Sequence, residues 1–284
     1  MATTAVEAPV VGATPAQKKT DKRVVRRRLG PGPRIPGTLW IGPLLLLGLW
    51  ALASATGVLD PRTLSEPWVV VETAQQLIAD GRLQDALATS AYRASLGLVI
   101  GVGVGLVLAL LSGLSRVGEA VIDGPVQVKR AIPSLALMPL LILWLGIGEP
   151  MKVITIALGV LIPIYIHTHN GLRGIDSRYA ELAETVSLGR GAFVRHVVLP
   201  GATPGFLLGL RFAVLNALLS LVVVEQVNAT SGIGHMITLA SSYGQTEIIV
   251  VGLVVYALLG LVADGIVRFI ERKALAWRRT LESH

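Results

Sequence analysis

Two charged side chains lie inside long apolar stretches of the sequence, where an ionisable group could carry a proton or bind an ion. Arg211 falls within residues 203–224 and Asp264 within residues 248–269. A charge in hydrocarbon costs free energy, so it usually has either a partner or a function. We interpret the two residues as a structural ion pair, for which Arg268 is a competing partner of Asp264. A proton relay through Asp264 is the alternative interpretation.

The other reactive side chains form no pattern typical of a metal or catalytic site. His167 and His169 are two residues apart and so lie on different faces of a helix, whereas a zinc site on one helix prefers a spacing of four. The chain contains no cysteine, which excludes thiolate chemistry and disulfides. No histidine and aspartate accompany the serines that a hydrolase could use, such as Ser95, Ser134 and Ser220. The sequence therefore predicts no metal site and no catalytic residue.

The sequence also lacks a nucleotide-binding loop. In a P-loop, GxxxxGK[ST], backbone amides hold the nucleotide phosphates and a lysine follows the second glycine. No lysine of this chain follows a glycine; the lysines are Lys18, Lys19, Lys22, Lys129, Lys152 and Lys273. We therefore expect the chain to bind no cofactor itself, and any ATP that drives it to be hydrolysed by another subunit.

The composition is that of a membrane protein. Hydrophobic residues make up 52% of the 284 residues, charged residues only 15%, and the mean hydropathy is +0.66, whereas soluble domains are about a quarter charged. A helix needs about 20 apolar residues to cross the hydrocarbon core. Six stretches are long enough, at about 35–59, 93–116, 130–149, 152–173, 203–224 and 248–269. The sequence predicts an all-α membrane protein with six transmembrane helices.

The distribution of charge predicts the orientation of these helices. The net charge of +7 comes from the two tails, residues 1–37 and 271–284, and not from a folded basic face, so we expect no nucleic-acid partner. Basic segments flank membrane helices on the cytoplasmic side, which places both termini in the cytoplasm. Residues 60–90 are acidic and residues 225–247 contain no Lys or Arg, so both segments are predicted to lie outside.

These patterns divide the chain into three parts. Residues 1–34 lack periodicity and are predicted to be a disordered basic cytoplasmic tail. Residues 35–278 form the predicted transmembrane domain, and residues 279–284 a short C-terminal tail.

Three glycines in the second span share one helical face because they recur every four residues. They are Gly97, Gly101 and Gly105. Small residues at this spacing let another helix approach closely. We expect the partner helix to belong to the same subunit, and a dimer seam is the alternative.

Residues 181–204, ELAETVSLGRGAFVRHVVLPGATP, are a polar interruption between two apolar spans. Apolar residues at i, i+3, i+4 and i+7 predict a short helix with one apolar face, for which Asp176 is a suitable N-cap. The apolar residues are Tyr179, Leu182, Ala183 and Val186. Gly189 and Gly191 permit a change of direction, and a second short helix is expected to end at Pro200. On the predicted cytoplasmic side this segment could dock a partner, or it could be only an amphipathic connection on the membrane.

This segment resembles the cytoplasmic EAA loop in permease subunits of bacterial ABC importers. That motif reads Glu-Ala-Ala, three residues, Gly, nine residues, Ile, one residue, Leu-Pro. The matching residues here are Glu181, Leu182, Ala183, Val197, Leu199 and Pro200. Ser187 stands at the position of the glycine, and Gly189 follows two residues later. Because serine tolerates a positive φ poorly, the turn after the first helix is the part of the motif from which this chain departs.

Longer runs are similar to the nitrate/sulfonate/taurine branch of the same permeases. They are PSLALMPLLILWLGIGEPMK (133–152), NGLRGID (170–176), LPGATPGFLLGLRFA (199–213) and VEQVNATSGIGHMI (224–237). The resemblance covers roughly residues 40 to 278. It implies the fold of a type I ABC importer permease in the bacterial inner membrane, and as solute a small organic anion such as an aliphatic sulfonate, taurine or nitrate.

The resemblance also implies partners for this chain. These are a second copy of the permease, two ATPase subunits that bind ATP, an extracytoplasmic substrate-binding protein and membrane lipid. In the family the EAA loop, here at about 176–200, forms a coupling helix that sits in a groove of the ATPase. The residues expected to take part in coupling are Glu181, Leu182, Ala183, Ser187, Gly189, Leu199 and Pro200.

Other classes of function stay open at this point. An ion-coupled secondary carrier or channel would work without ATPase subunits, and a membrane enzyme would turn over its substrate alone. The sequence does not identify the solute, because no cluster of arginines marks a path for an anion. Glu225, at the outer end of the fifth span, would repel an anion, and we interpret it as structural.

Overall fold

The structure, a computed structural model, describes residues 38–227 and 229–276. The predicted tails, residues 1–34 and 279–284, lie outside these residues. Every regular element that the structure describes is a helix. The chain divides into two units, residues 1–47 and 48–284, and the apolar helix α1 (Thr38–Ala55) crosses from the first into the second.

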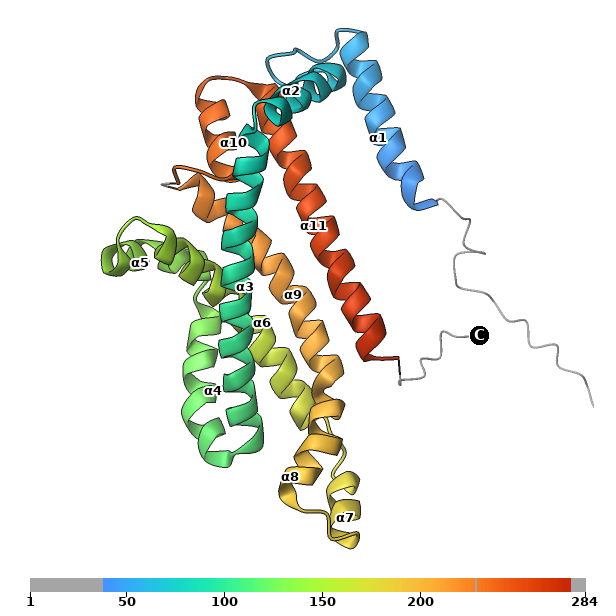
Figure 1. The fold of residues 1–284 in the computed structure, drawn as a ribbon, viewed down its shortest axis with the longest axis vertical. Coiled ribbons are helices and arrows are strands. Elements are labelled where there is room, and N and C mark those ends of the chain that lie inside the picture. Colours follow the sequence, from blue (N-terminus) through green and yellow to red (C-terminus); the bar gives the residue numbers. More distant parts are fainter. Residues whose placement is uncertain (1–37, 228, 277–284) are drawn as a thin grey trace, which may run out of the picture. The chain divides into compact units, whose positions relative to one another are not determined.

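The second unit consists of long helices with short helices at both ends (Figure 1). The long helices are α3 (Arg82–Leu114), α6 (Glu149–Arg173), α9 (Leu199–Gln226) and α11 (Thr246–Ala274). The shorter elements are α2 (Pro67–Ala79), α4 (Arg116–Ala131), η1 (Ser134–Leu137), α5 (Met138–Leu145), α7 (Arg178–Thr185), α8 (Arg190–Phe193), η2 (Val194–Val198) and α10 (Ile233–Ser242). Figure 1 places α2 and α10 at one end, here named the α10 end, and α7 and α8 at the other, the α7 end.

Helix α6 is the centre of this unit, because it packs along both α3 and α9. The largest apolar core lies along these contacts, and α6 contributes to it the side chains of Met151, Ile156, Val160 and Ile164, all fully buried. A second apolar core joins α2, α10 and α11 at the α10 end. The long helices thus connect the two ends through packed apolar cores.

The glycines of α3 bring this helix into close contact with α6. A Cβ atom at Gly101 would lie 2.6 Å from the carbonyl oxygen of Ala157. Cβ atoms at Gly97 and Gly105 would lie 2.6 and 2.8 Å from atoms of α6, closer than side chains can approach. The expectation that these glycines pack two helices of one subunit together is therefore confirmed.

Most of the predicted spans coincide with helices of the structure. Four described segments are long and apolar enough to cross a membrane: α3, α6, α11 and the continuous helical segment Arg190–Gln226 that contains α9. A bent pair of helices between α3 and α6 would be a fifth span. The predicted first span corresponds to α1, whose described apolar part, Ile41–Ala55, is shorter than these spans.

The third predicted span, about 130–149, is wrong as a single helix. Helix α4 and the segment Ser134–Leu145 form instead a pair bent by 90°. Pro133 lies at the bend and holds Ile132 in an extended conformation, because a proline disfavours the helical conformation of the residue before it. The twelve residues after the bend span only about 18 Å as a helix, less than the hydrocarbon core of about 30 Å. A crossing here needs α4, most of which lies between the second and third predicted spans.

Candidate functional site

The α7 end carries the EAA-like loop, where three large apolar side chains are left uncovered. The exposed fractions of Tyr179, Leu182 and Val186 are 54%, 59% and 63%. Tyr179 and Leu182 lie on one face of α7, as their spacing predicts, and Val186 directly follows the helix. Glu181 is exposed beside them. Ala183 is buried within the chain. The α7 helix therefore presents one apolar patch, formed chiefly by Leu182 with Tyr179 and Val186, among exposed charged residues.

Ser187 adopts the backbone conformation that favours glycine. Its φ of +51° is the only positive φ of a non-glycine residue among those that the structure describes. The Leu188 amide donates to the Ala183 carbonyl over 2.8 Å, and the Ser187 amide to the Glu184 carbonyl over 3.0 Å. These two bonds form the Schellman motif that commonly ends a helix with glycine in the left-handed position. The turn of the EAA loop is thus formed here with serine in place of glycine.

Ser187→Gly is expected to stabilise this turn by about 1 kcal/mol, since a left-handed conformation costs a residue with a Cβ roughly that much. Hydrogen–deuterium exchange of the Leu188 amide should slow about fivefold. Ala180→Gly, placed inside α7, is the matched control and should speed exchange instead, because glycine destabilises a helix interior. Faster exchange at Leu188 in Ser187→Gly would contradict the strain inferred from φ.

The chain after the turn does not stop at Pro200 as expected. Gly189 is exposed at the start of α8, and α8, η2 and α9 continue as one helical segment, Arg190–Gln226. The turn η2 is a π-helix that ends directly before Leu199 and Pro200. A proline ring clashes with the carbonyl four residues earlier, and a wider π-turn relieves such crowding. The prediction that Pro200 ends a short helix is therefore wrong, and the loop passes without interruption into α9.

The charged residues in the apolar spans lie together. Arg211 Nε is 3.5 Å from Asp264 Oδ1, and Arg268 Nη2 is 2.6 Å from Asp264 Oδ2. Both arginine side chains are about half exposed within the chain. Asp264 thus has two cationic partners, one on α9 and one on its own helix.

The two histidines point to different surroundings. The His167 ring stacks on Phe212 of α9 with centroids 5.1 Å apart. The His169 ring stacks on Tyr165 with centroids 5.5 Å apart. The residues that the structure describes contain no group of three or more His, Asp or Glu side chains able to hold a metal.

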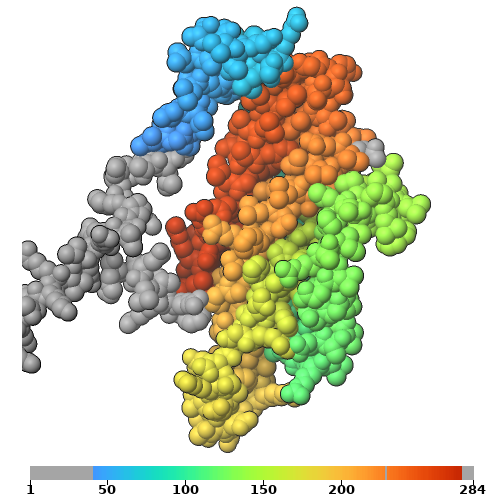
Figure 2. Space-filling view, turned by 180° about the vertical axis from the view of Figure 1, so that it is seen from behind, coloured from blue at the N-terminus to red at the C-terminus, as the bar shows by residue number. Residues whose placement is uncertain are grey.

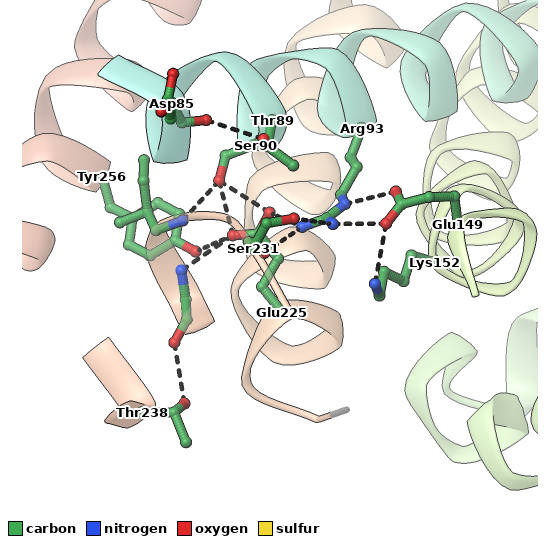
Figure 3. Close-up of polar contacts among 12 residues, drawn as sticks. Asp85, Thr89, Ser90, Arg93, Glu149, Lys152, Glu225, Ser231, Thr238 and Tyr256 are labelled. Atoms are coloured by element: carbon green, nitrogen blue, oxygen red, sulfur yellow. Dashed lines mark hydrogen bonds and ion pairs between the residues drawn. The ribbon is translucent and has the colours of Figure 1, made fainter. Parts of the chain in front are cut away.

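A buried cluster of charges near the α10 end was not predicted from the sequence (Figure 3). Arg93 of α3 is fully buried. Its Nε and Nη2 donate to the two carboxylate oxygens of Glu149 over 2.7 and 2.6 Å, and its Nη1 donates to Glu225 Oε1 over 2.7 Å. Lys152 Nζ lies 3.0 Å from Glu149 Oε1. Two cations therefore balance two carboxylates, and Arg93 joins α3 to both α6 and α9.

The Glu225 carboxylate accepts hydrogen bonds from three further groups (Figure 3). Ser90 Oγ donates over 2.7 Å, the Tyr256 hydroxyl over 2.9 Å and the Gly234 amide over 3.0 Å. Arg93 Nη1 also donates to the Ser231 carbonyl over 2.7 Å. Because these groups belong to α3, to the segment before α10, to α10 and to α11, the cluster holds the α10 end together.

The position of Glu225 agrees with its interpretation as a structural residue. Its side chain is fully buried, and Arg93 neutralises its charge. One signal in the sequence could have revealed the cluster: Arg93, Glu149 and Glu225 are opposite charges near the predicted outer ends of three different spans. Only the packing of α3, α6 and α9 shows that these ends meet.

Comparison with known proteins identifies this arrangement of helices. Residues 101–275 match the family model of the binding-protein-dependent transport system inner membrane component. The chain belongs to this family. It is thus the permease component of an ABC importer and a multi-pass membrane protein.

Two relatives of the permease match nearly its full length. A protein of Bacillus subtilis strain 168, named as an aliphatic sulfonates transport permease (SsuC), is 37% identical over 98% of this chain and 99% of its own. The SsuC of Escherichia coli strain K12, which bears the same name, is 44% identical over 84% of this chain and 90% of its own.

A solved structure shares the fold of the permease. A chain in the crystal structure of an amino acid ABC transporter with histidines superposes with a TM-score of 0.60 at 18% identity, over 70% of this chain and 97% of that one. At this identity the likeness concerns the fold alone. It agrees with the predicted type I ABC importer permease architecture.

Proposed function

We propose that this permease is the membrane subunit of an ATP-driven importer that carries small aliphatic sulfonates across a bacterial inner membrane. Two copies form the pathway, two ATPase subunits bind and hydrolyse ATP, and an extracytoplasmic binding protein delivers the solute. The permease binds no cofactor itself and catalyses no reaction.

The apolar surface of α7 is the observation that carries this proposal. Three large apolar side chains remain uncovered on a helix that ends in a well-formed Schellman turn. Large uncovered apolar groups at one site are typical of an interaction surface. The surface stands where the EAA motif predicts contact with an ATPase. Residues 170–200 contain four arginines, and basic loops favour the cytoplasmic side of the membrane. We therefore assign α7 as the coupling helix.

The continuous helix after the loop suggests how movement of α7 reaches the other end. Residues 190–226 form one helical segment, which at 1.5 Å per residue is about 55 Å long. Its far end carries Glu225, which the buried charge cluster ties to α3, α10 and α11. Closure of the ATPase subunits would thus tilt α9 as a lever and rearrange the α10 end, where the binding protein is proposed to dock.

The solute is proposed from the two SsuC relatives, whose names specify aliphatic sulfonates. No charge of the cluster at the α10 end is left to bind it, because cations and carboxylates balance there. The binding protein would then select the solute, and the permease would need only a path that accepts a small anion.

Uptake by the complete transporter tests this function. Proteoliposomes that contain the permease, its ATPase and its binding protein should accumulate radiolabelled ethanesulfonate only when ATP is present. A secondary carrier, the alternative, would accumulate it from an ion gradient without ATP. Uptake by the permease alone in ATP-free vesicles would therefore overturn the proposal.

A further inference from the structure

A cavity of about 550 Å³ lies between the α4–η1 bend, α6 and α9. Figure 2 shows the face of the unit on which these elements, coloured green, yellow and orange, lie side by side. The charged residues that line the cavity are Lys129 and Arg130, and no carboxylate lines it. His167, Asn216 and Ser220 add polar groups from α6 and α9. The cavity is thus positively charged within a membrane protein.

Lys129 has hydrogen-bond partners but no counter-ion. Its Nζ donates to Ser134 Oγ over 2.5 Å and to the Leu158 carbonyl over 3.0 Å. None of the described carboxylates forms a salt bridge with it. An ammonium has three donors, so one is left for a ligand. A half-buried cation without a carboxylate is costly in a membrane protein and usually marks a pathway.

The place of Lys129 along α4 puts this charge far from the first turn of the helix. Lys129 follows Arg116, the first residue of α4, by thirteen positions, which is about 20 Å along the helix axis. The hydrocarbon core is about 30 Å thick. Gly159 lets α6 and α9 approach closely beside the cavity, since a Cβ there would lie 2.8 Å from Ser220 Oγ.

The remaining walls of the cavity are apolar. Ile132 and Leu135 come from the bend, Ile162 from α6, and Phe212 and Leu219 from α9. The amide of Asn216 is already engaged, because its Nδ2 donates to the Phe212 carbonyl over 3.0 Å. A ligand that fits these walls has a small anionic head for Lys129 and a short apolar chain.

We propose that this cavity is a binding site for a small organic anion on its way through the permease, with Lys129 as the group that holds the sulfonate head. This proposal rests on the proposed function and specifies the solute path within it. Ser134 and Ser220 supply hydroxyl donors, Arg130 adds positive potential, and the apolar walls accept the alkyl chain. An anionic lipid headgroup shares the same chemistry and is the occupant to be distinguished.

Protection of a single cysteine tests the site directly. The chain contains no cysteine, so Asn216→Cys places one thiol in the cavity. In the permease–ATPase complex in phosphatidylcholine vesicles, ethanesulfonate should slow modification of this thiol by N-ethylmaleimide at least threefold, as read on the permease by mass spectrometry. In the double variant with Lys129→Gln, ethanesulfonate should no longer slow the modification. In the double variant with Lys129→Arg, it should still do so. Addition of Lys273→Gln, at the exposed end of α11, is the matched control and should also retain the slowing.

The outcomes separate the possible occupants. If phosphatidylglycerol slows the modification and ethanesulfonate does not, the occupant is a lipid headgroup and the proposal is overturned. Equal protection in Lys129→Gln and in the parent would also overturn it, because the lysine would then hold nothing.

Uptake measurements keep this proposal distinct from the proposed function. ATP-dependent uptake of ethanesulfonate without protection of the cysteine overturns the site and leaves the importer standing. Protection that depends on Lys129, without uptake, supports the site and overturns the assignment of sulfonate as the transported solute. In the complete transporter, Lys129→Gln should lower the rate of uptake at least tenfold, while ATP hydrolysis stimulated by the binding protein stays within about threefold of wild type.

Discussion

Leu182→Asp is expected to abolish uptake by the complete transporter and to weaken its association with the ATPase about 100-fold. Leu182 is an exposed apolar side chain at the centre of the α7 surface. Burying a leucine contributes about 1.5–3 kcal/mol, and an unpaired carboxylate in an apolar interface costs more. A loss of about 3 kcal/mol corresponds to the expected change in affinity. The measurement is the Kd of the detergent-solubilised permease for its ATPase, together with ATP-dependent uptake.

The same substitution should leave the permease itself folded, because Leu182 touches solvent more than protein. Membrane insertion and the melting temperature of the isolated permease should therefore equal those of wild type. Glu184→Gln changes the charge by one unit of the opposite sign on the opposite face of α7 and should alter the Kd by less than about threefold. Ala183→Asp is a poorer test, since Ala183 is buried and the loop itself would rearrange. A Leu182→Asp permease that binds its ATPase and imports solute normally would refute the role of α7.

Arg93→Met is expected to lower the free energy of unfolding by about 3–5 kcal/mol, the usual cost of removing one partner from a buried ion pair. The substitution leaves Glu225 buried without its cation and Glu149 with only Lys152. It also removes the hydrogen bond to the Ser231 carbonyl, which holds the segment before α10. Thermal unfolding of the purified permease in detergent should show a melting temperature lower by roughly 6–15 °C.

A double-mutant cycle separates charge from packing in this cluster. Glu225→Gln alone should also destabilise the permease, because Arg93 then faces one carboxylate fewer. The double variant with Arg93→Met regains charge balance. Its loss of unfolding free energy should therefore be smaller than the sum of the losses in the two single variants by about 1–3 kcal/mol. Arg268→Met is the control: its pair with Asp264 is half exposed and Arg211 remains, so the change should stay below about 1 kcal/mol. Additive losses of Arg93 and Glu225 would show that the two charges are not coupled.

The helical segments were the most predictable part of the fold, because hydrophobic length along the chain determines them. The spans around α3, α6, α9 and α11 follow from apolar runs bounded by charges. The span around 130–149 was misplaced because hydrophobic length alone was used to find it. Helix α4 contains Glu119, Asp123 and Lys129, so its sequence is typical of a loop outside the membrane. The chain itself provides partners for the two acidic residues of α4. Arg173 pairs with Glu119, and the Tyr165 hydroxyl donates to Asp123.

The candidate coupling surface was predictable because its residues are adjacent in sequence. Periodicity placed Leu182 on an apolar face, and the motif spacing located the turn at Ser187. The sequence could not show that the serine adopts a positive φ, since that depends on two backbone hydrogen bonds to Ala183 and Glu184. Nor could it show that the π-turn lets the helix continue past Pro200.

By itself, the sequence determined that this protein is an α-helical membrane protein, and it predicted a partner-binding loop and ATP hydrolysis on another subunit, because composition, periodicity and the missing P-loop are local properties. Tertiary structure alone decided which charged side chains have a partner of opposite charge and which do not. Arg93 and Glu225 are 132 residues apart along the chain and form one buried pair. Lys129, by contrast, faces a cavity built from α4, α6 and α9. Electrostatic partners are set by distance in space, and only the packing of the helices determines that distance.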